Sequence, residues 1–109
     1  MNEVKYALVT GASRGIGRAI ALKLAAQGFA IIINYASNVE AAQKTLDDII
    51  ENGGQGELLP FDVTDNKAIE EALQKWSFQH QNEYISVVIN NAGVRKDNLM
   101  MWMPMNLSI

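Results

Sequence analysis

The sequence predicts an α/β fold whose parallel sheet has the strand order 3-2-1-4, the N-terminal half of a doubly wound arrangement. Two observations lead to this prediction. Four short apolar runs alternate along the chain with segments whose apolar residues recur at helical spacing. The runs are apolar almost throughout, which is typical of strands that helices cover on both faces. Right-handed crossovers then make neighbouring strands parallel.

The expected strands are short apolar runs that stop at turn-forming residues. They cover residues 6–10, 30–33, 57–61 and 85–89. Gly11 ends the first run, and the segment Asn90-Asn-Ala-Gly93 follows the last. Pro60 lies in the third run and cannot donate to a strand ladder, so this strand is expected at an edge of the sheet.

Three helices are predicted between the strands. Their inward-facing residues are expected to be Ile16, Ala19, Ile20 and Leu24, then Ala42, Leu46, Ile49 and Ile50, then Ile69, Ala72, Leu73 and Trp76. Gly28 ends the first helix, as a C-terminal glycine commonly does. Ser37 or Asn38 can cap the second helix, and Thr64 or Asp65 can cap the third.

Composition excludes several classes of protein. The 109 residues carry a net charge of −3 and their nine Lys and Arg are scattered, so neither nucleic acid nor an anionic membrane is an expected partner. There is no Cys, which excludes disulfides and thiolate chemistry. The single histidine, His80, stands among polar residues and is expected to be a solvated loop residue rather than a metal ligand. Without a leader or a membrane-spanning run, the expected location is cytoplasmic.

A glycine-rich turn, Thr10-Gly-Ala-Ser-Arg-Gly-Ile-Gly17, joins the first strand to the first helix. Gly11 permits a sharp turn, while Gly15 and Gly17 remove side chains where a pyrophosphate approaches and where the helix packs. Free N–H groups at the start of the helix then bind the anion. Such glycines are often only packing devices. Their place between a strand and a helix favours a nucleotide site.

Two features favour NADP(H) as the nucleotide. NAD sites usually place an acid at the end of the second strand, and here Asn34 and Tyr35 occupy that place. Arg14 lies in the turn and can bind a 2′-phosphate bidentately, although it can also be a solvated surface arginine. Ser37 can contact the same phosphate or, with Asn38, simply cap the helix.

Three motifs in order carry a family resemblance: the glycine-rich turn, Asp62-Val63 after the third strand, and Asn90-Asn-Ala-Gly93 after the fourth. With this spacing the chain resembles the short-chain dehydrogenase/reductase family, whose fold is a Rossmann-type parallel sheet. Segments 11–20 and 91–100 look like 3-oxoacyl-[acyl-carrier-protein] reductases of fatty-acid synthesis. The resemblance covers about residues 3–103.

The resemblance implies NADP(H) as cofactor and assigns positions to it. Gly11, Ser13, Arg14, Gly15, Ile16 and Gly17 would line the diphosphate and the adenosine ribose, Asp62 and Val63 the adenine, and Asn91, Ala92 and Gly93 the nicotinamide-side ribose. Two of these have structural alternatives. Asp62 can serve helix capping with Thr64 and Asp65, and Asn91 can be a hydrogen-bond bracket between strands.

The family's reaction needs residues that this chain lacks. A hydride passes from the nicotinamide to a ketone, and a Tyr donates the proton, with its pKa lowered by a Lys four residues later. Four residues after the three tyrosines stand Thr10, Val39 and Val88, so no catalytic residue is assigned. The resemblance implies that the family's catalytic residues come from later elements.

We therefore expect residues 1–103 to be a truncated NADP-binding Rossmann domain and 104–109 an unmatched tail. The resemblance implies a 3-oxoacyl substrate linked to acyl-carrier protein. It also implies a homotetramer whose main interfaces are missing here, and a fragment that is itself inactive. The alternatives are a fragment of another short-chain dehydrogenase acting on a sugar, polyol or steroid, or an inert truncation product. Residues 99–103 are expected to form apolar surface for the missing half or for an acyl substrate.

Overall fold

Strands and helices alternate along the chain as predicted. The computed structural model describes residues 3–91. Its elements are β1 (Tyr6–Val9), α1 (Gly15–Ala26), β2 (Ala30–Tyr35), α2 (Val39–Glu51), β3 (Gln55–Pro60), α3 (Asn66–Gln79) and β4 (Ile85–Ile89). The expected boundary at residue 103, the tail 104–109 and the apolar stretch 99–103 lie outside the described residues.

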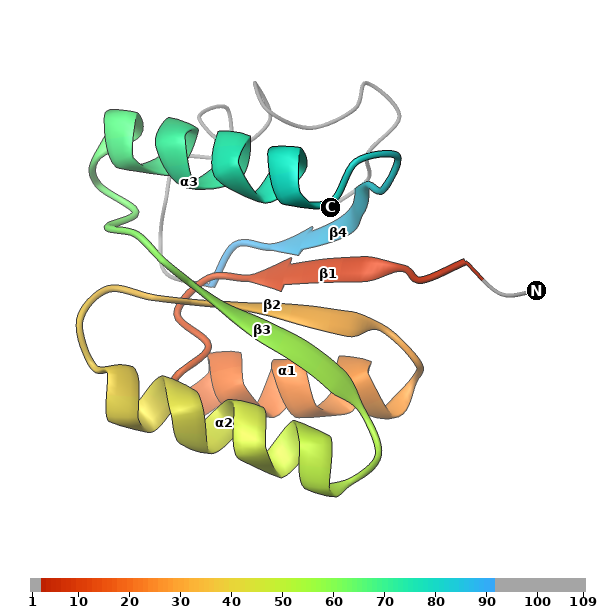
Figure 1. Ribbon diagram of the computed structural model, residues 1–109. Helices are drawn as coiled ribbons and strands as arrows, with labels where there is room; N and C mark the ends of the chain where they lie inside the picture. Colours follow the sequence, from red (N-terminus) through yellow and green to blue (C-terminus); the bar gives the residue numbers. More distant parts are fainter. Residues whose placement is uncertain (1–2, 92–109) are drawn as a thin grey trace.

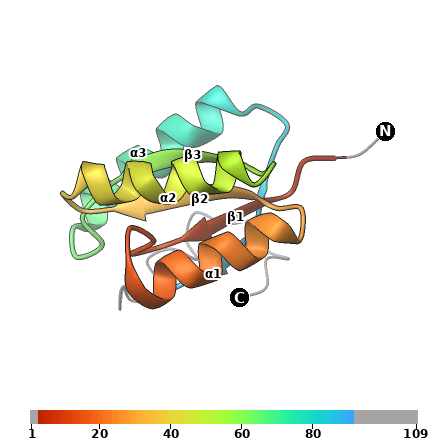
Figure 2. The same cartoon turned by 90° about the horizontal axis from the view of Figure 1, so that it is seen from below.

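The four strands form one parallel sheet in the order β3-β2-β1-β4, which confirms the predicted topology. Helices α1 and α2 lie on one face of this sheet and α3 lies on the other (Figure 1; Figure 2). Strand β3 stands at an edge, as Pro60 predicted, and begins two residues earlier than expected, at Gln55. All four strands point the same way, so their carboxyl ends meet at one edge of the sheet.

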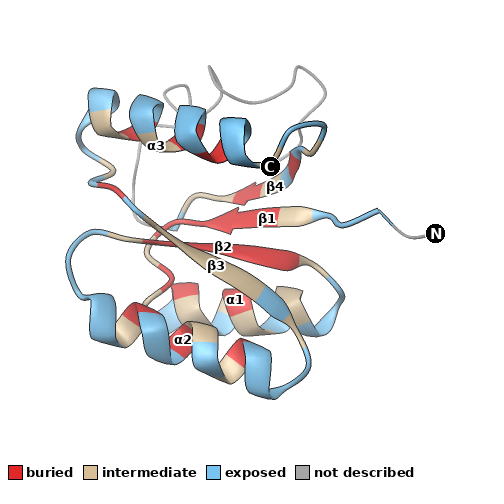
Figure 3. Cartoon of the chain, in the orientation of Figure 1, coloured by how far each residue is buried: buried red, intermediate tan, exposed pale blue. Residues whose placement is uncertain are grey.

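Two apolar cores lie on opposite faces of the sheet. Alternation along β1 sends Leu8 to the face under α3, and Ala7 and Val9 to the face under α1 and α2. Leu8 packs with Ile32 of the neighbouring strand, and all of these side chains are fully buried. Figure 3 shows β1 and β2 as the most buried elements, because both lie in the middle of the sheet.

The inward faces of α1 and α2 differ from the prediction. Ile16 is 73% exposed, whereas Gly17 and Ala21, which lie on another face of α1, are buried. Ala19 is also exposed. In α2, Ile50 is 55% exposed, since it lies about 100° around the helix from the buried Ile49.

The prediction that His80 is a solvated loop residue is wrong. His80 caps the C-terminus of α3, and its ring stacks on Trp76 with 4.2 Å between centroids. Its Nε2 lies 3.0 Å from Oε2 of Glu57 in β3. Tyr6 contacts both rings edge-on, and burial, together with the charge of Glu83, raises the pKa of its hydroxyl. The polar residues next to His80 in the sequence favour exposure, but Trp76, one helical turn earlier, and the distant Tyr6 and Glu57 surround the ring.

Among the described residues, no helix combines the length and the apolar character needed to cross a membrane.

Candidate nucleotide-binding site

The glycine-rich turn lies at the carboxyl end of β1 and leads directly into α1 (Figure 1). Gly11 and Gly15 have φ angles of 64° and 61°, in the left-handed region that glycine adopts without steric cost. A Cβ added at Gly15 would meet no atom within 4 Å, so the space beside this residue is open. The turn therefore combines glycine conformations with open space at the start of a helix.

Gly17 has a different role from Gly15. A Cβ at Gly17 would lie 2.1 Å from the carbonyl oxygen of Gly11 and 2.6 Å from Nδ2 of Asn91. Real Cβ atoms do not approach other atoms this closely, so only glycine fits. Gly17 thus allows α1 to pack against the turn, and Gly15 leaves the outer side of the turn open.

The turn presents unpaired N–H groups at the start of α1. The N–H of Ala12 donates to the backbone carbonyl of Asn34 at 3.0 Å, and helical bonding begins only with the N–H of Arg18, which donates to Arg14 at 3.2 Å. Because the first N–H groups of a helix precede its first intrahelical bond, those from Gly15 to Gly17 have no partner within α1. Such groups, with the helix dipole, form an anion site.

Arg14 and Ser37 are the predicted phosphate contacts outside the glycines. Arg14 is the exposed N-terminal cap residue of α1 and makes no capping bond with its side chain. Within residues 3–91 its guanidinium forms no ion pair. Asn38 caps α2 by accepting from the N–H of Ala41 at 3.0 Å, so the cap does not use the exposed Ser37. A phosphate contact by Arg14 or Ser37 stays a prediction.

Asn34 is a structural residue that the sequence reasoning missed. It is 1% exposed, and its Oδ1 accepts from the N–H of Gly11 at 3.3 Å. Its Nδ2 donates to the carbonyls of Leu59 and Phe61 at 3.2 and 3.1 Å. The side chain therefore ties the turn to β3 from the end of β2. The position of Asn34 directly after the apolar run 30–33 is the sequence feature that indicates this role, because a buried side-chain amide must be hydrogen-bonded.

Asp62 makes a local turn after β3. Its Oδ1 accepts from the hydroxyl of Thr64 at 2.7 Å and from the N–H of Thr64 at 2.9 Å. These hydrogen bonds hold the pKa of Asp62 below its usual value. Asp65 caps α3 by accepting from Ala68. Both bonds to Asp62 use Oδ1, which leaves Oδ2 as the oxygen for the predicted adenine contact. Val63, the other predicted adenine contact, packs half-buried against the core under α3.

Asn91 connects the end of β4 to the turn. Its Nδ2 donates to the carbonyl of Gly11 at 3.3 Å, which is the bracket that the sequence left open as one role of this residue. Asn91 is exposed, so a ligand can reach it. Ala92 and Gly93 lie outside the described residues. The structure thus brings Gly11, Gly17, Asn34 and Asn91 into direct contact, and Asp62 follows β3 at the same edge of the sheet.

No group of three or more His, Asp or Glu side chains that could hold a metal ion occurs within residues 3–91.

The strand order, the helices on both faces and the glycine-rich turn at the carboxyl edge define a Rossmann-type nucleotide-binding fold. Residues 5–106 match the model of the short chain dehydrogenase family, and the chain belongs to this family. The predicted family is thereby confirmed.

Curated relatives include 3-oxoacyl-[acyl-carrier-protein] reductases. The reductase of Escherichia coli strain K12 is 46% identical over 101 residues, which cover 93% of this chain and 39% of the relative. That of Staphylococcus epidermidis is 39% identical over 99 residues, which cover 91% of this chain and 40% of the relative. The chain therefore spans about 40% of the length of these relatives.

Solved structures of the family share the fold. A metagenomic short-chain oxidoreductase in complex with NADP matches with a TM-score of 0.75 and 37% identity, over 83% of this chain and 39% of the other. The angucycline C-6 ketoreductase LanV with bound NADP matches with a TM-score of 0.73 and 35% identity, over 83% and 37% respectively. The predicted Rossmann-type sheet is confirmed by this likeness.

Proposed function

We propose that the chain is the NADP(H)-binding portion of a 3-oxoacyl-[acyl-carrier-protein] reductase of fatty-acid synthesis. The observation that carries this proposal is the turn from Gly11 to Gly17, which presents unpaired N–H groups beside open space at the start of α1. The similarity to 3-oxoacyl-[acyl-carrier-protein] reductases supports the substrate class, a 3-oxoacyl thioester linked to acyl-carrier protein. When bound, NADPH supplies the hydride.

The residues at the turn suit a dinucleotide diphosphate. The N–H groups from Gly15 to Gly17 would bind its oxygens, with Ser13 beside them and the exposed Ile16 beside the ribose. Asp62 and Val63 would contact the adenine, and Asn91 would contact the nicotinamide-side ribose. All of these residues follow or flank the carboxyl ends of parallel strands, where ligands of this fold class bind.

The charges around the site favour a 2′-phosphate over a free 2′-hydroxyl. Arg14 offers a guanidinium that pairs with no described carboxylate. Asn34, in the place where NAD sites carry an acid, is neutral and turned to structural contacts. Because this position carries no carboxylate, it does not repel a 2′-phosphate. The bound NADP of two solved relatives agrees with this choice.

Proton donation in this family needs a Tyr with a Lys four residues later, and these 109 residues contain no such pair. A polypeptide of this sequence should therefore bind NADPH without reducing a 3-oxoacyl thioester. Measurable NADPH oxidation by the purified polypeptide with an acetoacetyl thioester would show that this part of the proposal is wrong.

A thermal-shift titration tests cofactor binding directly. NADPH at about 100 times its Kd should stabilise the protein by about 2.7 kcal/mol, whereas NADH at the same concentration should stabilise it much less. Arg14→Ala should weaken NADPH binding and leave NADH binding unchanged. Lys23→Ala removes an exposed cation from the last turn of α1 and is the matched control. Equal losses for both cofactors would exclude the 2′-phosphate role of Arg14.

A further inference from the structure

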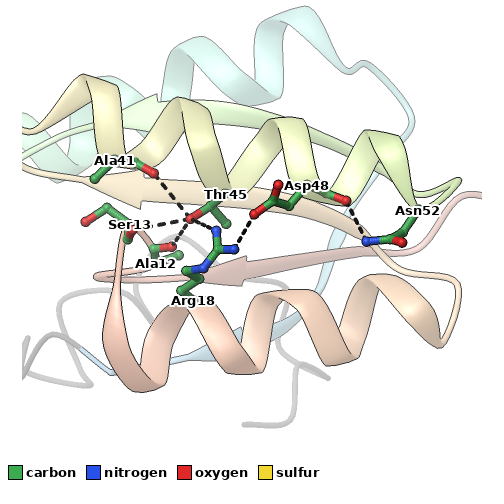
Figure 4. Close-up of polar contacts among 7 residues, drawn as sticks. All are labelled: Ala12, Ser13, Arg18, Ala41, Thr45, Asp48 and Asn52. Atoms are coloured by element: carbon green, nitrogen blue, oxygen red, sulfur yellow. Dashed lines mark hydrogen bonds and ion pairs between the residues drawn. The ribbon is translucent and has the colours of Figure 1, made fainter.

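The buried hydroxyl of Thr45 in α2 contacts the glycine-rich turn between β1 and α1 (Figure 4). Thr45 is 0% exposed and lies on the helix face that carries Ala42 and Ile49. Its Oγ1 lies 3.1 Å from the carbonyl oxygen of Ala12 and 3.3 Å from that of Ser13. A buried hydroxyl is costly unless it is hydrogen-bonded, and here its partners belong to the turn.

The usual partner of a threonine within a helix is the carbonyl four residues earlier. That oxygen, of Ala41, is 3.4 Å from Oγ1 and thus farther away than the carbonyl of Ala12. The single proton of the hydroxyl is therefore directed to the turn rather than to the helix of Thr45.

The guanidinium of Arg18 donates a hydrogen bond to the same hydroxyl. Nη1 of Arg18 donates to Oγ1 of Thr45 at 3.2 Å, and Nη2 of Arg18 pairs with Oδ2 of Asp48 one turn later in α2. The hydrogen bond from Arg18 holds the pKa of Asp48 below its usual value. Because Arg18 can only donate, the hydroxyl must accept from it and donate its own proton to the turn. A charged donor also makes the hydroxyl a stronger donor in turn.

These contacts orient two peptide groups of the turn. In a trans peptide the carbonyl of one residue and the N–H of the next point in opposite directions. The hydroxyl proton is shared between the carbonyl oxygens of Ala12 and Ser13, which holds both carbonyls toward α2. The N–H groups of Ser13 and Arg14 are therefore directed away from α2. No peptide bond in residues 3–91 is cis.

We propose that Thr45 is a positioning residue for the anion-binding turn, with Arg18 and Asp48 fixing its hydroxyl. It orients the N–H groups of Ser13 and Arg14 toward the diphosphate of a dinucleotide, so that they add to the donors at the start of α1. This proposal rests on the proposed dinucleotide binding. It goes beyond it by assigning a role in diphosphate recognition to a side chain that touches no ligand.

The test compares Thr45→Val with Thr45→Ser in the 109-residue protein. Valine keeps the branched shape and loses the hydroxyl, whereas serine keeps the hydroxyl. Binding is measured for NADPH, which has the diphosphate, and for adenosine 2′-phosphate, which lacks it. Thr45→Val should weaken NADPH binding by about tenfold or more and leave adenosine 2′-phosphate binding unchanged. Thr45→Ser should remain within about threefold of the unaltered protein for both ligands.

A general loss of structure would weaken both ligands alike, so equal losses, or no loss of NADPH affinity, would overturn the positioning role. A ligand-free measurement separates this inference from the proposed function. In NMR spectra of the free protein, the amides of Ser13 and Arg14 should gain mobility in Thr45→Val and not in Thr45→Ser. Unchanged amide relaxation in Thr45→Val overturns the inference. Failure of the unaltered protein to bind NADPH overturns the proposed function instead.

Discussion

Nε2 of His80 lies 3.0 Å from Oε2 of Glu57, so a side chain at the end of α3 contacts the edge strand β3. Nδ1 of the same ring lies 2.8 Å from the carbonyl oxygen of Trp76. Both partners are acceptors, so the imidazolium form donates to both, whereas a neutral ring donates to only one. His80 also stacks on the Trp76 ring at an interplanar angle of 8°. The residue thus joins a helix end, an aromatic cluster and a strand.

His80→Ala should lower the free energy of unfolding by about 1–3 kcal/mol, because it removes the stacked ring and both polar contacts. His80→Phe keeps an aromatic ring on Trp76 and should lose less. Urea unfolding at a fixed pH measures both variants. A value for His80→Ala within about 0.5 kcal/mol of the unaltered protein would mean that the cluster is not stabilising.

Gly17→Ala should destabilise the fold by about 3 kcal/mol or more, since the new Cβ would lie 2.1 Å from the backbone carbonyl of Gly11. Gly53→Ala is the matched control. It has a φ of 86° and open space where the new Cβ would lie, so only backbone strain of about 1–2 kcal/mol is expected. Thermal unfolding compares the two. Equal losses would indicate that α1 can move away from the turn at little cost.

Asn34→Asp should not convert the protein into an NAD-preferring one. The carboxylate would be buried against the carbonyls of Leu59 and Phe61, which now accept from Nδ2. The change should therefore cost about 2–5 kcal/mol of stability, because both hydrogen bonds from Nδ2 are lost and the buried charge keeps only the N–H of Gly11 as a donor. Circular dichroism during urea titration measures the loss. A stable Asn34→Asp variant with raised NADH affinity would contradict the bracket role of Asn34.

The ion pair of Arg18 and Asp48 should make the free energy of unfolding depend on pH in the acidic range. The folded-state pKa of Asp48 is lowered by the hydrogen bond from Arg18, so its contribution is present above the usual value of 3.8 and is lost as pH falls below it. Asp48→Asn should therefore lower stability at pH 7 and have a smaller effect below about pH 3.8. Denaturant unfolding from pH 7 to pH 3 measures this difference. In an Arg18→Met background the difference should disappear, and its persistence would assign it to another partner.

Much of the fold was predictable because its causes are local. Uninterrupted apolar runs predicted the buried strands, and Pro60 predicted an edge position for β3. The glycines of the turn predict a sharp turn and close packing, and the φ angle of Gly11 and the crowding at Gly17 agree with that prediction. The helical spacing predicts an inward position for Ile16, but Ile16 lies about 100° around α1 from the buried Gly17 and is exposed.

The sequence by itself determined the order of elements, the parallel sheet and the position of the glycine-rich turn. Each of these follows from the spacing of apolar residues and from the backbone conformations that glycine and proline allow. Only the tertiary structure decided the partners of Asn34, Thr45 and His80. These side chains meet residues 23 to 33 positions away, and a polar residue in a sequence window gives no indication of which distant group will satisfy it. A buried polar side chain must be hydrogen-bonded, and the fold decides which carbonyl, carboxylate or guanidinium is within reach.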